Sequence, residues 1–200
     1  VRHVSWSSCL LLLAFTASAQ TPVPYPATRV SEAPAVDGRL DDAAWRGLTA
    51  LELSYETDPA ENIPADVRTE VFVAYDDRAL YVAFRAHDPE PAKIRAHLSD
   101  RDQISRNDQV GFVLDPFDDQ RRGFAFMSNP LGVQADMVVS GVGSPAAGAF
   151  AFSGAPEEDF TWDAIWSASG RIGAGGYTVE IAIPFTSLRF PQGTSAQTWS

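Results

Sequence analysis

The chain has 200 residues with 26 acidic and 15 basic side chains, which gives a formal net charge of −11 at neutral pH. This acidity argues against a nucleic-acid partner, because phosphate backbones are held by clustered Lys and Arg side chains. Apolar residues make up 45% of the chain, as in ordinary globular domains, and the length suffices for one sizeable core. We therefore expect a single folded domain.

Residues 1–19 have the features of a secretory signal peptide. Arg2 precedes the apolar run Leu10–Phe15, and the small residues Ala17-Ser18-Ala19 come directly before Gln20. The apolar run is much shorter than the roughly 20 residues that span a bilayer, which disfavours a permanent membrane anchor. Cleavage before Gln20 would remove Arg2 and no acidic residue, leaving a net charge of −12. We expect an exported protein in the periplasm, at the outer membrane or at the cell surface.

Residues 20–35 are rich in proline and have no apolar period, which predicts an extended leader that pairs weakly if at all. The folded domain is expected over residues 36–200. Asp41 is placed to cap a short helix that ends at Gly47, with Trp45 on its inward side. The only cysteine, Cys9, lies in the signal peptide, so the processed domain has no disulfide framework.

Two β-branched and aromatic runs, Val67–Tyr75 and Leu80–Ala86, flank the short turn Asp76–Ala79 and predict a hairpin. Apolar alternation predicts further strands over residues 108–114, 123–128, 133–140, 162–169 and 176–183. Many short strands with Gly, Pro and Asp turns favour an all-β fold. We expect a two-sheet antiparallel β-sandwich, jelly-roll-like, with one short N-terminal helix.

Two further segments are expected to stand apart from this pattern. Gly141–Asp159, rich in Gly, Ala, Ser and Pro, predicts a long mobile loop. Gln197–Ser200 resembles the beginning of another strand. We therefore expect that the last strand is cut off and that these residues are the N-terminal part of a larger protein.

No residue pattern points to catalysis. No two of the three histidines have metal-ligand spacing or a plausible base role, no serine lies in a Gly-x-Ser-x-Gly motif, and the processed chain has no cysteine. Among the many acids, a glycosidase-like carboxylate pair is the alternative. Asp76-Asp77, Asp115-Pro116 and Asp118-Asp119 are better explained as turn formers, because Asp side chains bond their own backbone there. We expect a protein that is not an enzyme.

Five segments in one order resemble the family 9 carbohydrate-binding modules. They are Asp37–Trp45, Thr69–Phe84, Asp108–Asp115, Asn129–Asp136 and Gly176–Phe185, and the resemblance covers about Val36 to Phe190. It implies a non-catalytic β-sandwich that binds a saccharide or glycan by aromatic stacking and polar contacts, with a link to carbohydrate catabolism through family association. In sugar-binding members a tryptophan, an acid and an arginine occupy the positions that correspond here to Ser105, Gly111 and Met127.

The sequence nevertheless offers a different set of polar and aromatic candidates near the same edge. The candidate ligand-binding residues are Arg106, Asn107, Asp108, Asn129, Gln134, Asp136, Phe160 and Trp162, with Arg101 and Gln109 close by. Asn129–Gly132 is equally well explained as a structural turn. Asp100, Asp102 and Asp108 supply the oxygen ligands that calcium prefers, without the spacing of the 12-residue calcium loop. No other cofactor is expected.

Two alternatives stay open. One branch of the family continues after this domain into an outer-membrane β-barrel. The sequences of Asn129–Asp136 and Ile183–Phe185 resemble that branch particularly well. In that branch the domain would serve as a structural or interaction module on the same chain as the barrel, with the sugar site lost. The other alternative is a haem-binding sandwich, which needs an axial Met and His pair among Met127, Met137, His87 and His97.

Overall fold

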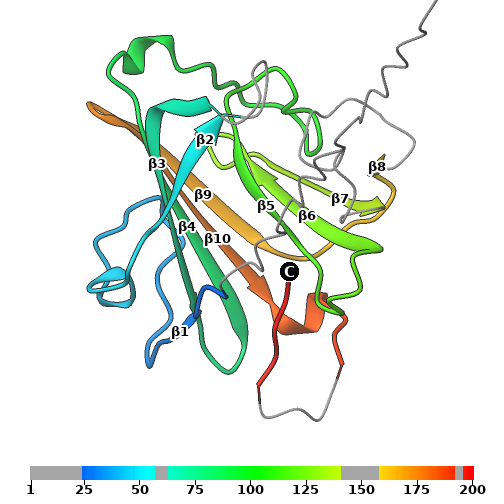
Figure 1. The fold of residues 1–200 in the computed structure, drawn as a ribbon. Coiled ribbons are helices and arrows are strands. Elements are labelled where there is room, and N and C mark those ends of the chain that lie inside the picture. The colour runs from blue at the N-terminus through cyan, green and yellow to red at the C-terminus, as the bar shows by residue number, and fades with distance from the viewer. Residues whose placement is uncertain (1–23, 57–62, 141–157, 192–195) are drawn as a thin grey trace, which may run out of the picture.

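The computed structural model describes residues 24–56, 63–140, 158–191 and 196–200 (Figure 1). The predicted signal peptide, residues 20–23 of the leader and residues 141–157 of the predicted loop lie outside these ranges. Within the described residues no helix is long and apolar enough to cross a membrane. The helical elements found there are the short 3-10 turns η1 (Ala43–Trp45), η2 (Pro91–Lys93) and η4 (Phe185–Ser187).

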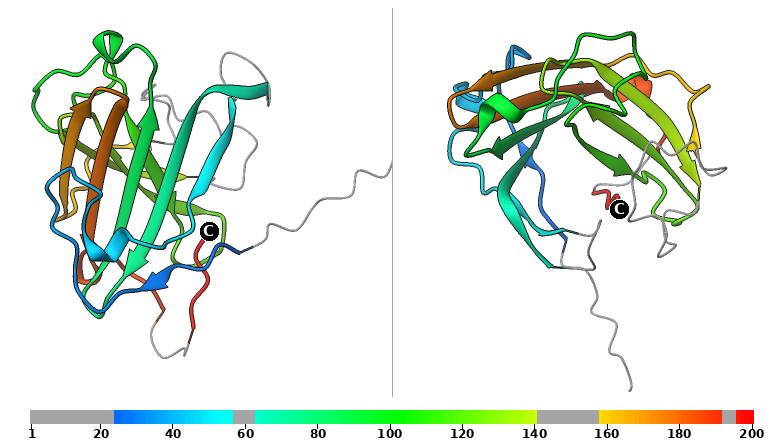
Figure 2. Two further views of the ribbon diagram at one scale, coloured as in Figure 1. Left: turned by 90° about the vertical axis from the view of Figure 1, so that its left-hand side faces the viewer. Right: turned by 90° about the horizontal axis from the view of Figure 1, so that it is seen from above.

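The strands of the described residues form two sheets that face each other (Figure 2). Sheet A has the order β1 (Thr28–Arg29), β3 (Ile63–Tyr75), β4 (Ala79–His87), β10 (Gly176–Pro184) and β9 (Ser167–Gly173), with β2 (Leu51–Glu56) also paired to β3. Sheet B has the order β5 (Val110–Leu114), β6 (Arg122–Ser128), β7 (Gln134–Ser140) and β8 (Glu158–Asp159). All pairings are antiparallel except that of β1 with β3. The predicted all-β sandwich is confirmed.

Several predicted strands are confirmed at nearly their predicted bounds, although β3 begins at Ile63, four residues before the predicted Val67. The hairpin β3–β4 turns at Asp76, whose Oδ1 accepts hydrogen bonds from the N–H groups of Arg78 and Ala79 at 2.7 and 2.8 Å. β5, β6, β7 and β10 also match the predicted segments to within two residues. The leader pairs over two residues only, as β1.

The predicted strand over residues 162–169 is wrong in its first half. β9 begins at Ser167, because the backbone of Ala164 is hydrogen-bonded to the side chains of Asp136 and Arg101. The N–H of Ala164 donates to Asp136 Oδ2 at 2.7 Å, and its carbonyl oxygen accepts from Arg101 Nη2 at 2.8 Å. Two further differences are β2, which was not predicted, and β8, which lies in the last two residues of the predicted loop.

Each sheet has apolar side chains packed on both of its faces. Between the sheets lies a core that includes Phe84, Phe126 and Ile181, all at most 1% exposed. The outer face of sheet A, turned away from sheet B, carries Phe72, Ala83 and Trp45 beneath the N-terminal segment, which crosses this face in Figure 2. The outer face of sheet B carries a third cluster, Ile104, Ala125, Met127, Ala135, Met137 and Val139. These clusters fill the sheet faces only in part, because β2 and much of β9 are exposed.

The N-terminal segment is fastened to sheet A by one buried carboxylate. Glu180 is 1% exposed, and its Oε2 accepts hydrogen bonds from the backbone N–H groups of Asp37, Gly38 and Arg39 at 2.9, 2.7 and 3.2 Å. Burial raises the pKa of Glu180, and these bonds partly oppose that shift. Gly38 has φ +81°, and a Cβ there would lie 3.0 Å from the carbonyl carbon of Gly170, so only glycine fits.

Trp45 is buried as predicted, but the capping prediction is wrong. The short helix is the single 3-10 turn η1, and its N-cap is Asp42, which makes no side-chain capping bond. The carboxylate of Asp42 instead accepts a hydrogen bond from the N–H of Ala35 at 3.0 Å. Trp45 is held inward by its packing against sheet A, which leaves η1 little need of a cap.

Candidate ligand-binding sites

Two of the positions that correspond to the family's sugar contacts, Gly111 and Met127, are packed against each other. Gly111 on β5 lies opposite Met127 on β6, and a Cβ at Gly111 would collide with Met127 Sδ and lie 2.5 Å from the backbone oxygen of Phe126. Met127 is 7% exposed and belongs to the cluster that also contains Ile104. Ser105 is exposed on the neighbouring loop. The space that an acid and an arginine would need is therefore filled by a thioether.

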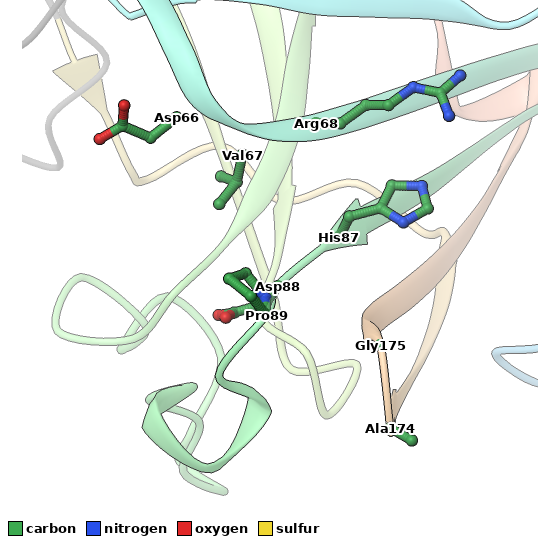
Figure 3. Close-up of a pocket in the computed structure, with 8 residues that line it drawn as sticks. All are labelled: Asp66, Val67, Arg68, His87, Asp88, Pro89, Ala174 and Gly175. Carbon is green, nitrogen blue, oxygen red and sulfur yellow. The ribbon is translucent and has the colours of Figure 1, made fainter.

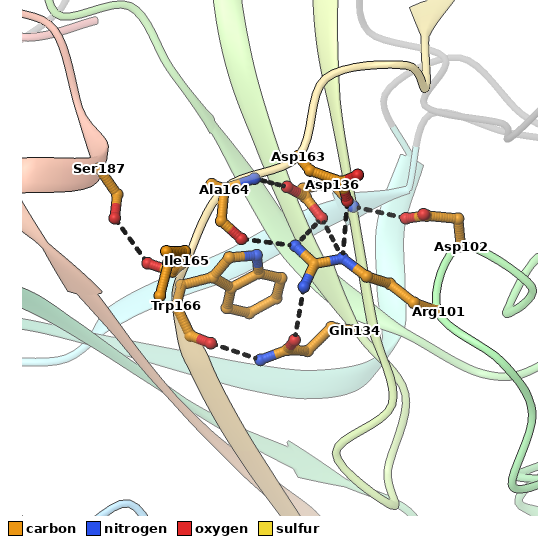
Figure 4. A network of polar contacts seen from close by, with 9 residues as sticks. All are labelled: Arg101, Asp102, Gln134, Asp136, Asp163, Ala164, Ile165, Trp166 and Ser187. Atoms are coloured by element: carbon orange, nitrogen blue, oxygen red, sulfur yellow. Dashed lines mark hydrogen bonds and ion pairs between the residues drawn. The ribbon is translucent and has the colours of Figure 1, made fainter.

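Two of the predicted site residues, Gln134 and Asp136, are brought together by Arg101 (Figure 4). Its Nε donates to Asp136 Oδ1 at 2.8 Å, and its Nη1 donates to Gln134 Oε1 at 3.1 Å. Its Nη2 donates to Asp136 Oδ1 and to the carbonyl oxygen of Ala164. Gln134 Nε2 in turn donates to the carbonyl oxygen of Trp166 at 2.9 Å, and the guanidinium lies 5.8 Å from the Trp166 ring centroid.

These contacts make the Arg101 network a structural connection between three segments. Asp136 is fully buried, and both of its carboxylate oxygens are used inside the protein. Asp102 accepts a hydrogen bond from the N–H of Asp136 at 3.0 Å, while burial raises the pKa of the Asp102 carboxyl. Of this set, Asp163 has the most open side chain, 74% exposed and 3.3 Å from Arg101 Nε. The network leaves only its rim available to a ligand.

Three other predicted site residues have internal partners. Asn129 is fully buried, and its Oδ1 accepts from the N–H groups of Leu131 and Val133, which confirms the structural-turn alternative. Asn107 Oδ1 accepts from the N–H of His97 at 2.6 Å. Asp108 accepts from Arg95. Arg106 is exposed on the same loop and is not brought to the other candidates by any contact of the described residues.

The calcium ligands suggested by the sequence are not brought together. Asp102 is used by the backbone of Asp136, and Asp108 is used by Arg95, so their carboxylates serve different partners. In the described ranges no three His, Cys, Asp or Glu side chains gather closely enough to hold a metal ion. For the haem alternative, His87 lies on sheet A, whereas Met127 and Met137 lie on the outer face of sheet B. The backbone N–H of His97 donates to Asn107 Oδ1, which also lies 3.3 Å from His97 Nδ1, and no described contact joins His97 to either methionine.

The predicted aromatic candidates lie on opposite faces of sheet B. Phe160 packs against the outer cluster. Trp162 is half-buried at the edge of the inter-sheet core, with its ring centroid 4.7 Å from that of Phe124 and 5.8 Å from that of Phe126. Trp162 is therefore a part-exposed indole on an aromatic base, and the next residue is the exposed Asp163.

Sequence reasoning missed a polar region at the end of sheet A (Figure 3). A hollow of about 410 Å³ is lined by Asp66, Val67, Arg68, His87, Asp88, Pro89, Ala174 and Gly175. Arg68 and His87 extend to the same side from neighbouring strands, and both contact the buried carboxylate of Glu70, at 2.8 and 3.0 Å. The hydrogen bond from His87 lowers the pKa of Glu70, and Arg68 and Arg85 add to the effect. The register of the predicted hairpin is the signal that could have found this region, because it places Glu70 opposite Arg85.

Comparisons with known proteins show the fold. No protein-family model and no curated protein matches the chain. A family 9 carbohydrate-binding module from Caldicellulosiruptor kristjanssonii, solved in complex with glucose, superposes with a TM-score of 0.52 at 15% identity, over 86% of this chain and 75% of that one. A candidate carbohydrate-binding protein from Bacteroides uniformis gives a TM-score of 0.50 at 13% identity, over 86% of this chain and 76% of that one. The chain thus has the fold of the family 9 carbohydrate-binding modules.

Proposed function

We propose that this chain is a non-catalytic carbohydrate-binding module of an exported protein. The observation that carries the proposal is the shared fold with a family 9 module that was solved with glucose bound. The signal-peptide features of residues 1–19 support export to a compartment where glycans are met. The carboxylates of Asp76 and Asp115 accept hydrogen bonds from backbone N–H groups of their own turns, which supports the non-catalytic part of the proposal.

The proposed contact surface is Trp162 with its polar neighbours. Sugar recognition needs an aromatic plane against the apolar face of a pyranose and polar groups that hold its hydroxyls. Trp162 supplies the plane, because Phe124 supports the indole from one side at a centroid distance of 4.7 Å. Asp163 supplies an exposed carboxylate for hydroxyl groups, and Arg101, 33% exposed, lies at the same rim. This surface lies at the edge of the inter-sheet core, on the other side of sheet B from Met127.

The test is titration calorimetry of the purified protein against neutral glucans, xylans and their oligosaccharides, with and without calcium. We expect saturable millimolar or tighter binding that Trp162→Ala abolishes. Trp162→Phe controls for folding, because the variant keeps an aromatic ring against Phe124. This variant should bind the sugar with reduced affinity. Phe117→Ala is the matched control, because Phe117 is 52% exposed on the turn after β5. Binding that Trp162→Ala leaves intact would place the sugar elsewhere.

A second function has one specific observation in its favour. The packing of Met127 on Gly111 removes the family's own contact positions, as expected of a domain that keeps the fold for structure or interaction beside an outer-membrane β-barrel. If a demonstrably folded protein gives no heat with any glycan, this interaction module becomes the better account. Copurification of the natural full-length chain with outer-membrane fractions would then be the direct test.

A further inference from the structure

The outer face of sheet A carries a polar row that runs across five of its strands in register. The paired residues of this row are Glu52, Glu70, Arg85, Thr178 and Arg171, from β2, β3, β4, β10 and β9. A second row beside it pairs His87 on β4 with Gly176 on β10 and Gly173 on β9. Because paired residues project to the same face, the two rows form one continuous surface.

The glycines of the second row open a hollow on this surface. Its volume is about 280 Å³, and its lining includes Arg85, His87, Arg171, Gly173, Gly176 and Thr178. Gly176 has φ +126° and its Cβ would collide with the backbone oxygen of Ala86, so the backbone itself requires glycine there. At Gly173, in contrast, a Cβ would meet no atom within 4 Å. The hollow therefore exists because the strand carries no side chain at this point.

The charged side chains that line this hollow are Arg85 and Arg171, with His87 beside them, although the chain as a whole is strongly acidic. Glu70 accepts from Arg68, Arg85 and His87, and Glu52 lies 3.4 Å from Arg68, so these two acids share two guanidinium groups. Arg171 forms no ion pair with any described residue and is exposed. Asp66 and Asp88 line the neighbouring hollow of about 410 Å³ and not this one.

Arg85 is held in place by its neighbours, whereas the guanidinium of Arg171 is exposed and only the base of its side chain is packed. The guanidinium of Arg85 lies 5.4 Å from the ring centroid of Phe72 and is anchored by Glu70, which limits its rotamers. The first carbon of the Arg171 side chain lies against Gly38, in the segment that Glu180 fastens, and Thr178 Oγ1 donates to the Gly38 carbonyl at 2.7 Å. Two guanidinium groups flanking a hydroxyl-bearing floor suit an anionic group that carries neighbouring hydroxyls.

We propose that this hollow binds a saccharide residue with an anionic substituent, a uronic carboxylate or a sulfate ester, between Arg85 and Arg171. The saccharide part rests on the proposed carbohydrate-binding function. The volume is below the roughly 300–1,000 Å³ of typical small-molecule pockets, which fits a single sugar residue. The neighbouring hollow shares His87 and Gly175 and lies where the next residue of the glycan would go. A net charge of −11 disfavours long polyanions, so the ligand is a short glycan with an isolated acidic residue.

The experiment compares cellobiouronic acid, cellobiose 6′-sulfate and cellobiose by calorimetry on the purified protein. We expect at least one acidic disaccharide to bind about tenfold or more tightly than cellobiose. Arg171→Gln and Gly173→Leu should each remove that advantage, because the first deletes a charge and the second fills the hollow. Neither variant should unfold the protein, because Arg171 has no ion-pair partner in the described structure and Gly173 faces open space.

The control is Arg121→Gln, which removes an exposed arginine near sheet B and should change no affinity. The two acidic probes distinguish carboxylate from sulfate. Equal affinity for the acidic and neutral disaccharides, or an acidic advantage that survives both variants, overturns the inference. Its failure is separate from that of the proposed function, because cellobiose binding depends on Trp162 and should be unchanged in Arg171→Gln. If no glycan binds at all, both proposals fail together.

Discussion

The indole Nε1 of Trp45 donates a 2.7 Å hydrogen bond to Oε1 of Glu180, a residue 135 positions later in the chain. The other oxygen of Glu180 receives the three backbone N–H groups of residues 37–39. The first and last of the five segments that resemble family 9 modules therefore meet at one buried carboxylate. Their Asp37-Gly38 turn and Trp45 serve the closure of the fold over sheet A, and no ligand is needed to explain them.

This clamp predicts a large loss of stability in Glu180→Ala. The change leaves buried donors without an acceptor, and we expect the free energy of unfolding to fall by about 3 kcal/mol or more. Chemical denaturation followed by tryptophan fluorescence measures it. Glu180→Gln keeps one acceptor oxygen and should lose less. A double-mutant cycle with Trp45→Phe should give a coupling energy of about 0.5–3 kcal/mol, and additive effects would contradict the clamp.

Gly111→Ala should destabilise the protein although it adds a single methyl group. The new Cβ meets Met127 Sδ and the backbone oxygen of Phe126 at 2.5 Å, and the backbone oxygen cannot move aside. Overpacking of this kind costs about 1–3 kcal/mol. Gly173→Ala is the matched control, since a Cβ at that strand position meets nothing within 4 Å. Equal melting temperatures for the two variants would show that the outer cluster of sheet B has room to adjust.

Asp136→Asn should cost much more stability than Asp163→Asn, although both carboxylates contact Arg101. Asp136 is fully buried, so the change breaks a buried charge pair, a loss of about 3–5 kcal/mol. Asp163 is 74% exposed, and exposed pairs contribute about 0–1 kcal/mol. Urea denaturation at neutral pH compares the two. Similar midpoints would mean that Arg101 holds its segments through Gln134 and the Ala164 carbonyl alone.

The lowered pKa of Glu70 predicts that the stability of the protein falls at acidic pH. Its pKa in the folded protein is lowered from 4.5, first by the hydrogen bond with His87. For a carboxyl group with a lowered folded pKa, the stabilisation is present above the unfolded pKa and is lost as the pH falls through the folded value. Glu70→Gln should therefore be less stable than wild type at pH 7, and the difference should shrink below pH 4.5. Unfolding curves between pH 3 and 7 measure it, and a constant difference would exclude this contribution.

The strands were predictable because their signal is local. Alternation of apolar and polar residues marks β5 and β10, and the side chain of Asp76 forms the hairpin turn within its own segment. The same alternation is present in β2, at Leu51, Leu53 and Tyr55, so this strand was also predictable from the sequence. Residues 162–166 could not have been assigned correctly, because Asp136 and Arg101 redirect their backbone from a distance.

For the candidate sites, too, local sequence signals were predictable and contacts between distant residues were not. The sequence determined by itself that Gln134 and Asp136 are polar residues on one strand face and that the fold is an all-β sandwich. Only the tertiary structure decided that Arg101 binds these polar groups internally, that Met127 packs on Gly111, and that Arg85 and Arg171 line one hollow. The physical reason is that strand periodicity is set by neighbouring residues. Whether a polar side chain is satisfied or open depends on partners that only sheet pairing brings together.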